Sequence, residues 1–336
     1  MGSKLINKTL IIAEAGVNHN GNIEIAKKMV RAASAAGADI IKFQTFKADL
    51  LLRKNTKKPN YIKKLIKQKS QFQILKNLEF FEKNFQNLKN YCKKYKIEFM
   101  SSPFDLESLN IVKKLKVKRI KIPSGEINNF PLVKQIGKLK KKVIISTGMS
   151  NVSEIKNCLD LLLKSGTRKN NICILQCNSE YPSPFQDINL KAMQTIKKKF
   201  KIQTGLSDHS IGIEIPIAAV AMGARIVEKH VTLNKSLQGP DHQASINFQE
   251  LNTMIKSIRN VELAIGSGIK KVTSSEKKNK NLVRKSIVAK RNILKGEKFS
   301  ENNLTTKRPG FGISPNKWNK ILGKKAKKNY LKDQNI

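Results

Sequence analysis

Residues Gly205 to His242 read GLSDHSIGIEIPIAAVAMGARIVEKHVTLNKSLQGPDH, and their order of apolar and polar residues decides the fold. An apolar run ends in SDHS, a helix-like segment follows, and a second apolar run ends in EKHV. His209, His230 and His242 lie here, and the fourth histidine, His19, lies in a second polar patch, EAGVNHNG. Histidine is the commonest metal ligand and the usual group for proton transfer near neutral pH. The pattern therefore predicts a functional site at the ends of strands.

The same arrangement, a short apolar run that ends in polar residues, recurs along the chain. β-Branched residues are frequent in these runs, and the lengths suit strands buried in a parallel sheet. We predict eight strands on this basis: Leu10–Ala15, Ile40–Thr45, Ile97–Ser102, Arg119–Ser124, Val143–Thr147, Ile172–Asn178, Ile202–Ser207 and Arg225–Val231.

Segments with helical spacing separate several of these runs. They are Ile23–Ala36, Asp105–Leu115, Ser150–Lys164, Asp187–Phe200 and Ile211–Ala221, and Asn247–Ile265 follows the last strand. Eight strands that alternate with helices in about 240 residues are typical of a (β/α)8 TIM barrel. A doubly wound open sheet is the alternative, but it would require a glycine-rich first turn. The insert Ala48–Asn77 is longer than an ordinary loop, and we expect it to form a lid over one end.

The rest of the chain predicts a second, smaller domain. Residues 1–266 would form the catalytic barrel, and residues 267–285 are polar and poor in apolar periodicity, as expected of a linker. Residues 286–336 contain short β-like runs and turn signals, which indicate a small β-rich domain. A unit of about 50 residues has a marginal core, so we expect it to lean on the barrel or on a second subunit.

Composition narrows the possible classes of protein. The 336 residues carry a formal net charge of +42, spread along the whole length with few aromatic residues. We interpret this charge as a lysine bias of the solvated surface, with steering of an anionic substrate as its functional consequence. There is no long apolar stretch and no signal-peptide pattern, so we expect a cytoplasmic protein without a membrane partner. The four cysteines show no framework spacing and should be reduced.

Two lysines within apolar strands, Lys42 and Lys121, point to an anionic ligand. An unpaired ammonium group is costly to bury, and either a bound anion or an internal ion pair would offset that cost. The neighbouring hydroxyl groups suit a ligand with both phosphate and carboxylate. In a barrel, the polar strand ends would converge on one site. They are Glu14, Lys42, Gln44, Ser101, Ser102, Lys121, Ser124, Glu126, Ser146, Thr147, Asn178, Ser207, His209 and His230.

His209 and His230 end neighbouring strands of the predicted barrel. Adjacent strands lie about 4.8 Å apart, so both side chains could reach one divalent ion that also holds a substrate oxygen. Two structural histidines at the barrel rim are the alternative. Glu126 is a candidate general acid or base, or else a partner of a helix N-terminus. Asp241 would hydrogen-bond a polyol, or else be a turn residue.

The motifs taken together resemble the sialic acid synthase family, which includes N-acetylneuraminate, legionaminic acid and pseudaminic acid synthases. The similar stretches are IIAEAGVNHNG, IKFQTFKAD, SSPFD, KIPSGE, IISTGM, QCNSEYPSPFQDINL, GLSDHS, EKHVTL and GPDHQAS. The tail, RKSIVAKRNILKGEKFSENNLTTKRPGFGISP, is similar to the antifreeze-like (SAF) domain of that family. The resemblance implies a TIM barrel followed by a SAF domain.

The resemblance also implies a reaction. Phosphoenolpyruvate would add through its methylene carbon to the aldehyde of open-chain N-acetylmannosamine, water would attack the enolpyruvyl carbon, and phosphate would leave by C–O cleavage. His209 and His230 would hold Mn²⁺ or Mg²⁺, and Glu126 would move protons. Phosphoenolpyruvate would be held by Lys42, Ser102, Lys121, Ser124, Ser146, Asn178, Ser179 and Ser207. The amino sugar would be held by Glu14, Gln44, Tyr181, Asp241 and, in a domain-swapped homodimer, Arg308.

Several alternatives remain open. GPDHQAS and CNSEYP favour N-acetylneuraminate as the product, with N,N'-diacetyllegionaminate or pseudaminate as the alternative made by the same chemistry. A Schiff-base aldolase that uses Lys42, Lys121 or Lys229 would need no metal. A basic nucleic-acid-binding scaffold is the remaining alternative, although we expect no nucleic-acid partner.

Overall fold

Eight apolar runs form the parallel strands of a barrel in the computed structural model, which describes residues 8–59, 62–63 and 69–336. The strands are β1 (Leu10–Gly16), β2 (Ile40–Thr45), β3 (Glu98–Pro103), β4 (Arg119–Ile122), β5 (Lys142–Ser146), β6 (Ile172–Cys177), β7 (Gln203–Asp208) and β8 (Ile226–Thr232). Each overlaps a predicted strand.

The strands pair in the order β3-β2-β1-β8-β7-β6-β5-β4, and β3 also lies beside β4. The ring is therefore nearly closed, and the prediction of a TIM barrel is confirmed. All the ladders between these strands are parallel, so their carboxyl ends gather at one end of the barrel. The pairing of β1 with β8 places Glu14 opposite His230.

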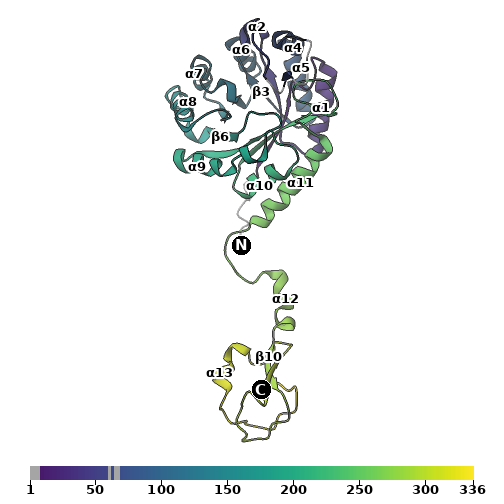
Figure 1. The fold of residues 1–336 in the computed structure, drawn as a ribbon, viewed down its shortest axis with the longest axis vertical. Helices are drawn as coiled ribbons and strands as arrows, with labels where there is room; N and C mark the ends of the chain where they lie inside the picture. The colour runs from purple at the N-terminus through teal and green to yellow at the C-terminus, as the bar shows by residue number, and fades with distance from the viewer. Residues whose placement is uncertain (1–7, 60–61, 64–68) are drawn as a thin grey trace. The chain divides into compact units, whose positions relative to one another are not determined.

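Helices surround the strands (Figure 1). They are α1 (Ile23–Ala36), α5 (Glu82–Lys94), α6 (Leu106–Lys114), α7 (Phe130–Lys138), α8 (Val152–Lys164), α9 (Leu190–Phe200), α10 (Glu214–Ala221) and α11 (Phe248–Ile265). The predicted ranges did not include α5 or α7, and α10 begins three residues later than predicted. Gly212 has φ of 82°, a left-handed conformation that is incompatible with a helix at that point.

The first helix shows how local sequence sets these elements. The Asn22 side chain accepts hydrogen bonds from two backbone N–H groups of the first turn, and Gly37, with φ of 90°, ends α1. The buried face includes Met29 and Val30. A fully buried aliphatic side chain stabilises the fold by about 1.5–3 kcal/mol, so packing rather than capping dominates the stability of α1.

A small apolar layer fills the inside of the barrel below the site. It consists of Ile12, Ile40, Met100, Ile144, Cys173, Leu175 and Ile226. Side chains two residues apart on a strand share a face, so the next inward layer follows from the sequence. That layer is polar and consists of Glu14, Lys42, Ser102, Ser146, Cys177 and Glu228. The barrel interior therefore has an apolar layer beneath a polar, charged layer.

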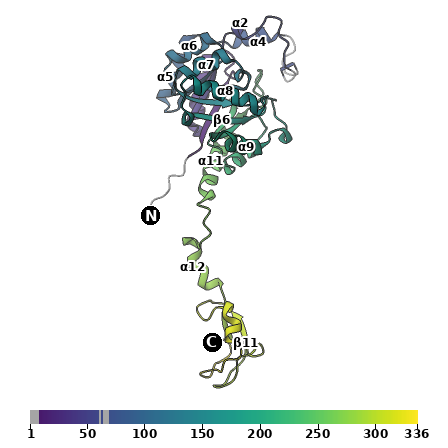
Figure 2. The ribbon, with the colours of Figure 1, turned by 90° about the vertical axis from the view of Figure 1, so that its left-hand side faces the viewer.

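The insert after β2 lies at one end of the barrel, where Figure 2 shows α2 (Ala48–Leu51) and α4 (Gln71–Leu78). Its apolar side chains pack with residues that follow β1 and β2 in a small cluster of Val17, Phe46, Ile62, Ile74 and Leu78. Leu51, Leu75 and Phe104 pack against this cluster, and all three also line the cavity described below. Residues 60–61 and 64–68 of the predicted lid lie outside the described residues.

The chain divides into two compact units, Met1–Gly266 and Ser267–Ile336. In the second, β10 (Ser286–Ala289) pairs antiparallel with β11 (Leu304–Lys307) over a core that includes Ile293, Phe299 and Tyr330. The segment predicted as a linker contains an exposed helix, α12 (Ser274–Val283). No helix within the described ranges has the length and apolar character needed to cross a membrane.

Candidate active site

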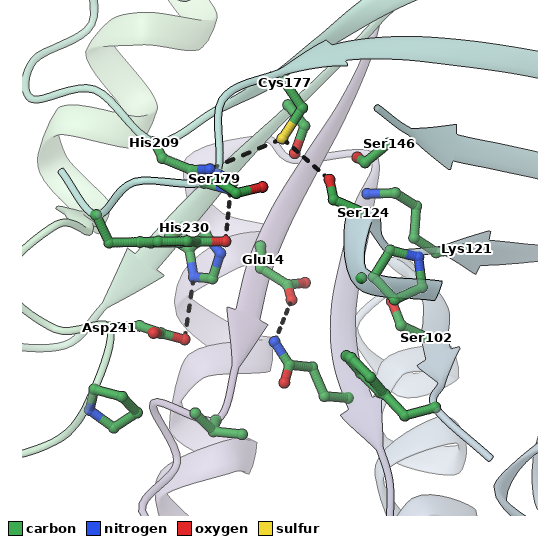
Figure 3. A pocket seen from close by; sticks show the side chains of 18 of the residues that line it. Glu14, Ser102, Lys121, Ser124, Ser146, Cys177, Ser179, His209, His230 and Asp241 are labelled. Carbon is green, nitrogen blue, oxygen red and sulfur yellow. Dashed lines mark hydrogen bonds and ion pairs between the residues drawn. The ribbon is translucent and has the colours of Figure 1, made fainter. Parts of the chain in front are cut away.

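A cavity of about 480 Å³ opens among the carboxyl ends of the strands (Figure 3). Most of the residues that the sequence analysis assigned to substrates or metal line it. They are Glu14, Lys42, Gln44, Ser102, Lys121, Ser124, Ser146, Ser179, Tyr181, Ser207, His209, His230 and Asp241. Figure 3 shows the histidines and Asp241 on one side, and Lys121 with Ser102, Ser124 and Ser146 on the other.

Two lysines and two glutamates form a buried charge cluster on the floor of this cavity. Lys42 Nζ lies 2.9 Å from Glu14 Oε1 and 3.6 Å from Glu228 Oε1. Lys121 Nζ lies 2.6 Å from the same oxygen of Glu228. The strand lysines thus have internal ion pairs, the alternative that the sequence left open. The second carboxylate oxygens of Glu14 and Glu228 are buried and have no hydrogen-bond partner among the described residues.

Burial and the neighbouring charges shift the pKa values in this cluster. Burial raises the pKa of Glu14 to about 7, although Lys42 opposes the shift. Burial also lowers the pKa of Lys121, and the ammonium group of Lys42 adds to that effect. For Lys42, burial is outweighed by Glu14 and Glu228, which leave its pKa raised. A Glu14 that is partly protonated near neutral pH offsets less of the charge of Lys42, which favours an anionic ligand.

Hydroxyl groups surround the charge cluster. Ser102 Oγ accepts a hydrogen bond from Lys42 Nζ at 3.0 Å, and Ser207 Oγ donates to Glu228 at 3.3 Å. Ser124 Oγ accepts from the backbone N–H of Gly148 at 3.0 Å. Ser146 Oγ is buried with no partner in the described part of the chain. These hydroxyls and ammonium groups provide the donors that an anion with several oxygens requires.

The two imidazoles that end β7 and β8 face each other across 5.3 Å between ring centroids. His209 Nδ1 lies 2.5 Å from the backbone oxygen of Asn178, and His209 Nε2 lies 3.1 Å from the Tyr181 hydroxyl. His230 Nδ1 is buried and lies 3.7 Å from Asp241 Oδ2, too far for a hydrogen bond. Burial, followed by His209, holds the pKa of His230 well below its usual value, so this ring is neutral.

These features fit a divalent cation. A neutral imidazole with a buried, unpartnered nitrogen is the form in which histidine binds metals, and His230 presents such an Nδ1; on His209, Nε2 contacts the Tyr181 hydroxyl. No group of three His, Cys, Asp or Glu side chains is arranged to hold a metal ion in the described ranges. An ion held by both imidazoles would therefore take its other ligands from water or substrate.

Three of the residues assigned to the reaction do not line the cavity, and neither do the strand-end residues Ser101 and Thr147. Glu126 is buried beside it, where its Oε2 accepts a hydrogen bond from Asn129 at 2.7 Å and burial raises its pKa. The Asn178 side chain is held within its own loop, where its Oδ1 accepts a hydrogen bond from Ser183 Oγ at 3.1 Å. Asn178 therefore contacts His209 through its backbone oxygen. Arg308 is exposed and belongs to the second unit.

The other two histidines, to which the sequence analysis assigned no role, lie outside the cavity. The His19 ring stacks on Phe80 with centroids 3.9 Å apart. His242 lies between Thr232 Oγ1, 2.8 Å from its Nδ1, and Asn20 Oδ1, 3.2 Å from its Nε2. Their rings tie loops together instead of lining the cavity.

Lys229, one of the Schiff-base candidates, also lies outside the cavity. It alternates with Glu228 and His230 along β8, so it points away from the barrel interior. Its Nζ lies 2.5 Å from Asp208 Oδ2 and from the backbone oxygen of Ser210. An amine held between a carboxylate and a backbone oxygen, and outside the cavity, is badly placed to attack a substrate carbonyl there.

The sequence analysis missed Glu228, Cys177 and the cavity residues of the insert. Glu228 could have been found, because it lies two residues before His230 and must share its face. The Cys177 thiol lies 3.9 Å from His209 Nδ1 and receives a 3.5 Å hydrogen bond from Ser124. Nothing in the sequence of the insert indicated which of its residues face the cavity.

Comparison with known proteins accounts for both units. A barrel with this polar mouth, followed by a small β unit, matches two family models: the NeuB family over residues 29–270 and the SAF domain over residues 284–336. The chain belongs to the NeuB family, and it is an enzyme of the nonulosonic acid synthase class.

Relatives with known names cover nearly the whole chain. N,N'-diacetyllegionaminic acid synthase of Campylobacter jejuni is 51% identical over 98% of this chain and 99% of its own. The protein of the same name from Legionella pneumophila is 44% identical over 95% and 90%. The crystal structure of an N-acetylneuraminic acid synthetase from Leptospira borgpetersenii in complex with citrate is similar with a TM-score of 0.71, at 34% identity over 83% and 94%. These similarities favour the legionaminic alternative over the N-acetylneuraminate prediction.

Proposed function

We propose that the protein is an N,N'-diacetyllegionaminic acid synthase, which condenses phosphoenolpyruvate with 2,4-diacetamido-2,4,6-trideoxymannose and water. The observation that carries this choice of sugar is the near full-length similarity to two relatives of that name. The prediction of N-acetylmannosamine rested on two short segments, and similarity over the whole chain outweighs them.

Phosphoenolpyruvate would lie over the charge cluster. Its phosphate and carboxylate would accept hydrogen bonds from Lys42 and Lys121, and the raised pKa of Glu14 reduces the negative charge that competes for Lys42. The unpartnered hydroxyl of Ser146 supports the same placement. The remaining contacts would come from Ser102, Ser124, Asn178, Ser179 and Ser207.

The sugar would lie between the imidazoles and the mouth of the cavity. Asp241 and Gln44 line the wall next to His230 and Glu14, where their polar groups can bind hydroxyls. Tyr181 stacks on His209 with centroids 4.1 Å apart and would turn its hydroxyl to the sugar. Glu14 would complete this set, and Arg308 would be supplied by the second subunit of a homodimer.

The reaction forms one carbon–carbon bond and breaks one carbon–oxygen bond. The methylene carbon of phosphoenolpyruvate bonds to the aldehyde carbon of the open-chain sugar, whose oxygen takes a proton. Water adds to the former enol carbon, and phosphate leaves with the bridging oxygen. Glu126 would hold and release protons, because burial raises its pKa. A divalent cation bound by His209 and His230, Mn²⁺ or Mg²⁺, would supply Lewis-acid polarisation of the aldehyde oxygen.

A phosphate-release assay tests this function directly. The purified protein is given phosphoenolpyruvate, Mn²⁺ and one of three sugars: the diacetamido-trideoxymannose, its altrose-configured isomer, or N-acetylmannosamine. We expect the highest kcat/KM with the first sugar and no phosphate release without sugar. A preference for the altrose isomer or for N-acetylmannosamine would assign the enzyme to pseudaminate or N-acetylneuraminate synthesis and refute the proposal.

A further inference from the structure

One wall of the cavity comes from the insert after β2 and differs in character from the charged floor. Leu51 of α2 and Leu75 of α4 are half-buried and line the cavity. They pack against the same apolar cluster as Phe104, which follows β3. The remaining apolar lining residues on this side are Phe46, Pro59 and Ile62. Ligand atoms next to this wall must be largely apolar.

A single amide side chain, Gln71, interrupts this wall. Gln71 lines the cavity, is 8% exposed, and begins α4 directly after the capping residue Ser70. Its Oε1 is buried and has no hydrogen-bond partner among the described residues. A buried acceptor without a partner is costly, and a ligand that donates a hydrogen bond to it removes that cost.

We propose that Gln71, Leu51 and Leu75 form a subsite for the second acetamido group of the sugar, the group at carbon 4 that N-acetylmannosamine lacks. The inference rests on the proposed function and adds to it the residues that select the substrate. An acetamido group has one N–H donor and one methyl group. Gln71 Oε1 would accept from the N–H, and the two leucines would contact the methyl group.

The position of the insert selects this acetamido group over the one at carbon 2. The aldehyde carbon must lie beside the imidazoles and the charge cluster, where phosphoenolpyruvate reacts. The group at carbon 2 is attached next to that carbon and stays close to the floor. The group at carbon 4 is two carbons further along the open chain. It therefore reaches beyond the strand ends, where α2 and α4 lie (Figure 2).

The test compares two sugars that differ only at carbon 4: the diacetamido-trideoxymannose and 2-acetamido-2,6-dideoxymannose, which has a hydroxyl there. We expect Gln71→Leu to lower the ratio of the two kcat/KM values about tenfold, the effect of one lost hydrogen bond. The KM for phosphoenolpyruvate should not change. Gln86→Leu, the same substitution at an exposed helical position, should leave the ratio at the wild-type value.

Two further measurements separate recognition from folding. Removal of an unpartnered buried acceptor should leave Tm unchanged or raise it, whereas removal of a structural amide would lower Tm. Leu75→Asn, which changes the apolar wall and keeps Gln71, should also lower the ratio. An equal loss of kcat/KM for both sugars, or no loss for either, would overturn the subsite while the proposed function stands. A wild-type preference for N-acetylmannosamine would instead refute the proposed function.

Discussion

At the scale of single residues, the charge cluster is electrostatically unusual because it brings together four charged side chains that are all buried. Glu228 Oε1 lies 2.6 Å from Lys121 Nζ and 3.6 Å from Lys42 Nζ. The other carboxylate oxygen of Glu228, and one oxygen of Glu14, have no partner in the described part of the chain. Removing one member of such a cluster would leave a buried charge uncompensated. The cluster is therefore arranged to be completed by a ligand that brings negative charge to the lysines.

The two imidazoles give a prediction about metal binding that does not depend on turnover. His230→Ala should weaken Mn²⁺ binding at least tenfold in a calorimetric titration, because it removes one of two protein ligands. His242→Gln changes a histidine outside the cavity and should bind Mn²⁺ as the wild type does. Equal Mn²⁺ affinity in His230→Ala and the wild type would show that the ion is held elsewhere or not at all.

The buried histidine of the NHNG motif gives a pH-dependent prediction. Burial lowers the pKa of His19 to about 3, so the unfolded chain binds a proton at higher pH than the folded chain does. Stability from the neutral ring is complete above the unfolded pKa of 6.5 and is lost as pH falls from 6.5 toward 3. Between pH 7.5 and pH 5 the loss is about 2 kcal/mol.

The free energies of unfolding of the wild type and of His19→Gln, measured in urea at these two pH values, check this prediction. The variant should lose about 2 kcal/mol less than the wild type between the two pH values. His242, whose pKa burial lowers to about 4, contributes equally to both proteins and cancels. An identical pH dependence in the two proteins would mean that His19 is accessible to protons in the folded state.

At the scale of elements, the alternation of side chains along each strand explains most of what could be predicted. On β1, Ile12 lies in the apolar layer and Glu14 in the charged layer above it. On β8, Ile226 and Glu228 repeat this pattern. The sequence therefore predicted the strands and most cavity residues. It did not predict that Glu228 pairs with Lys121 across the barrel, because that contact depends on ring closure.

Helical elements were predicted less well where spacing alone was the guide. The exposed helix α12 has no buried residue, so it leaves no apolar periodicity to detect. The insert was expected over one end, but the direction of Gln71 or Leu75 depends on how α4 packs, and its sequence does not show this. The sequence assigned no role to His19 or His242, because a buried structural ring and a ligand have the same local sequence environment.

The ion pair between β7 and β8 gives a prediction at this scale. Lys229 joins the strand that carries His230 to Asp208 and Ser210, which flank His209. Lys229→Met would leave the Asp208 carboxylate buried and unpaired, at a cost of about 3–5 kcal/mol. Thermal unfolding should show the loss, and Lys229→Met combined with Asp208→Asn should recover part of it. A Lys229→Met enzyme with wild-type Tm would contradict a structural role.

At the scale of the whole molecule, the two units have separate cores, and the homodimer stays a prediction. If Arg308 of one subunit completes the site of another, two inactive variants should complement each other. Co-expression of Arg308→Ala with His230→Ala should then restore sugar-dependent phosphate release above that of either variant alone. Lys320→Ala, an exposed change in the same unit, should be fully active by itself. No gain over the better single variant would contradict a site shared between subunits.

The central claim is that this barrel mouth carries out a condensation with C–O cleavage. The most direct test follows the bridging oxygen of phosphoenolpyruvate into the products. The protein is incubated with the diacetamido-trideoxymannose, Mn²⁺ and phosphoenolpyruvate that carries heavy oxygen at the bridge, and both products are weighed by mass spectrometry. The account predicts that the label leaves with phosphate and that the new sugar acid takes its oxygen from water. Label retained in the sugar acid, or no sugar acid formed, would contradict it.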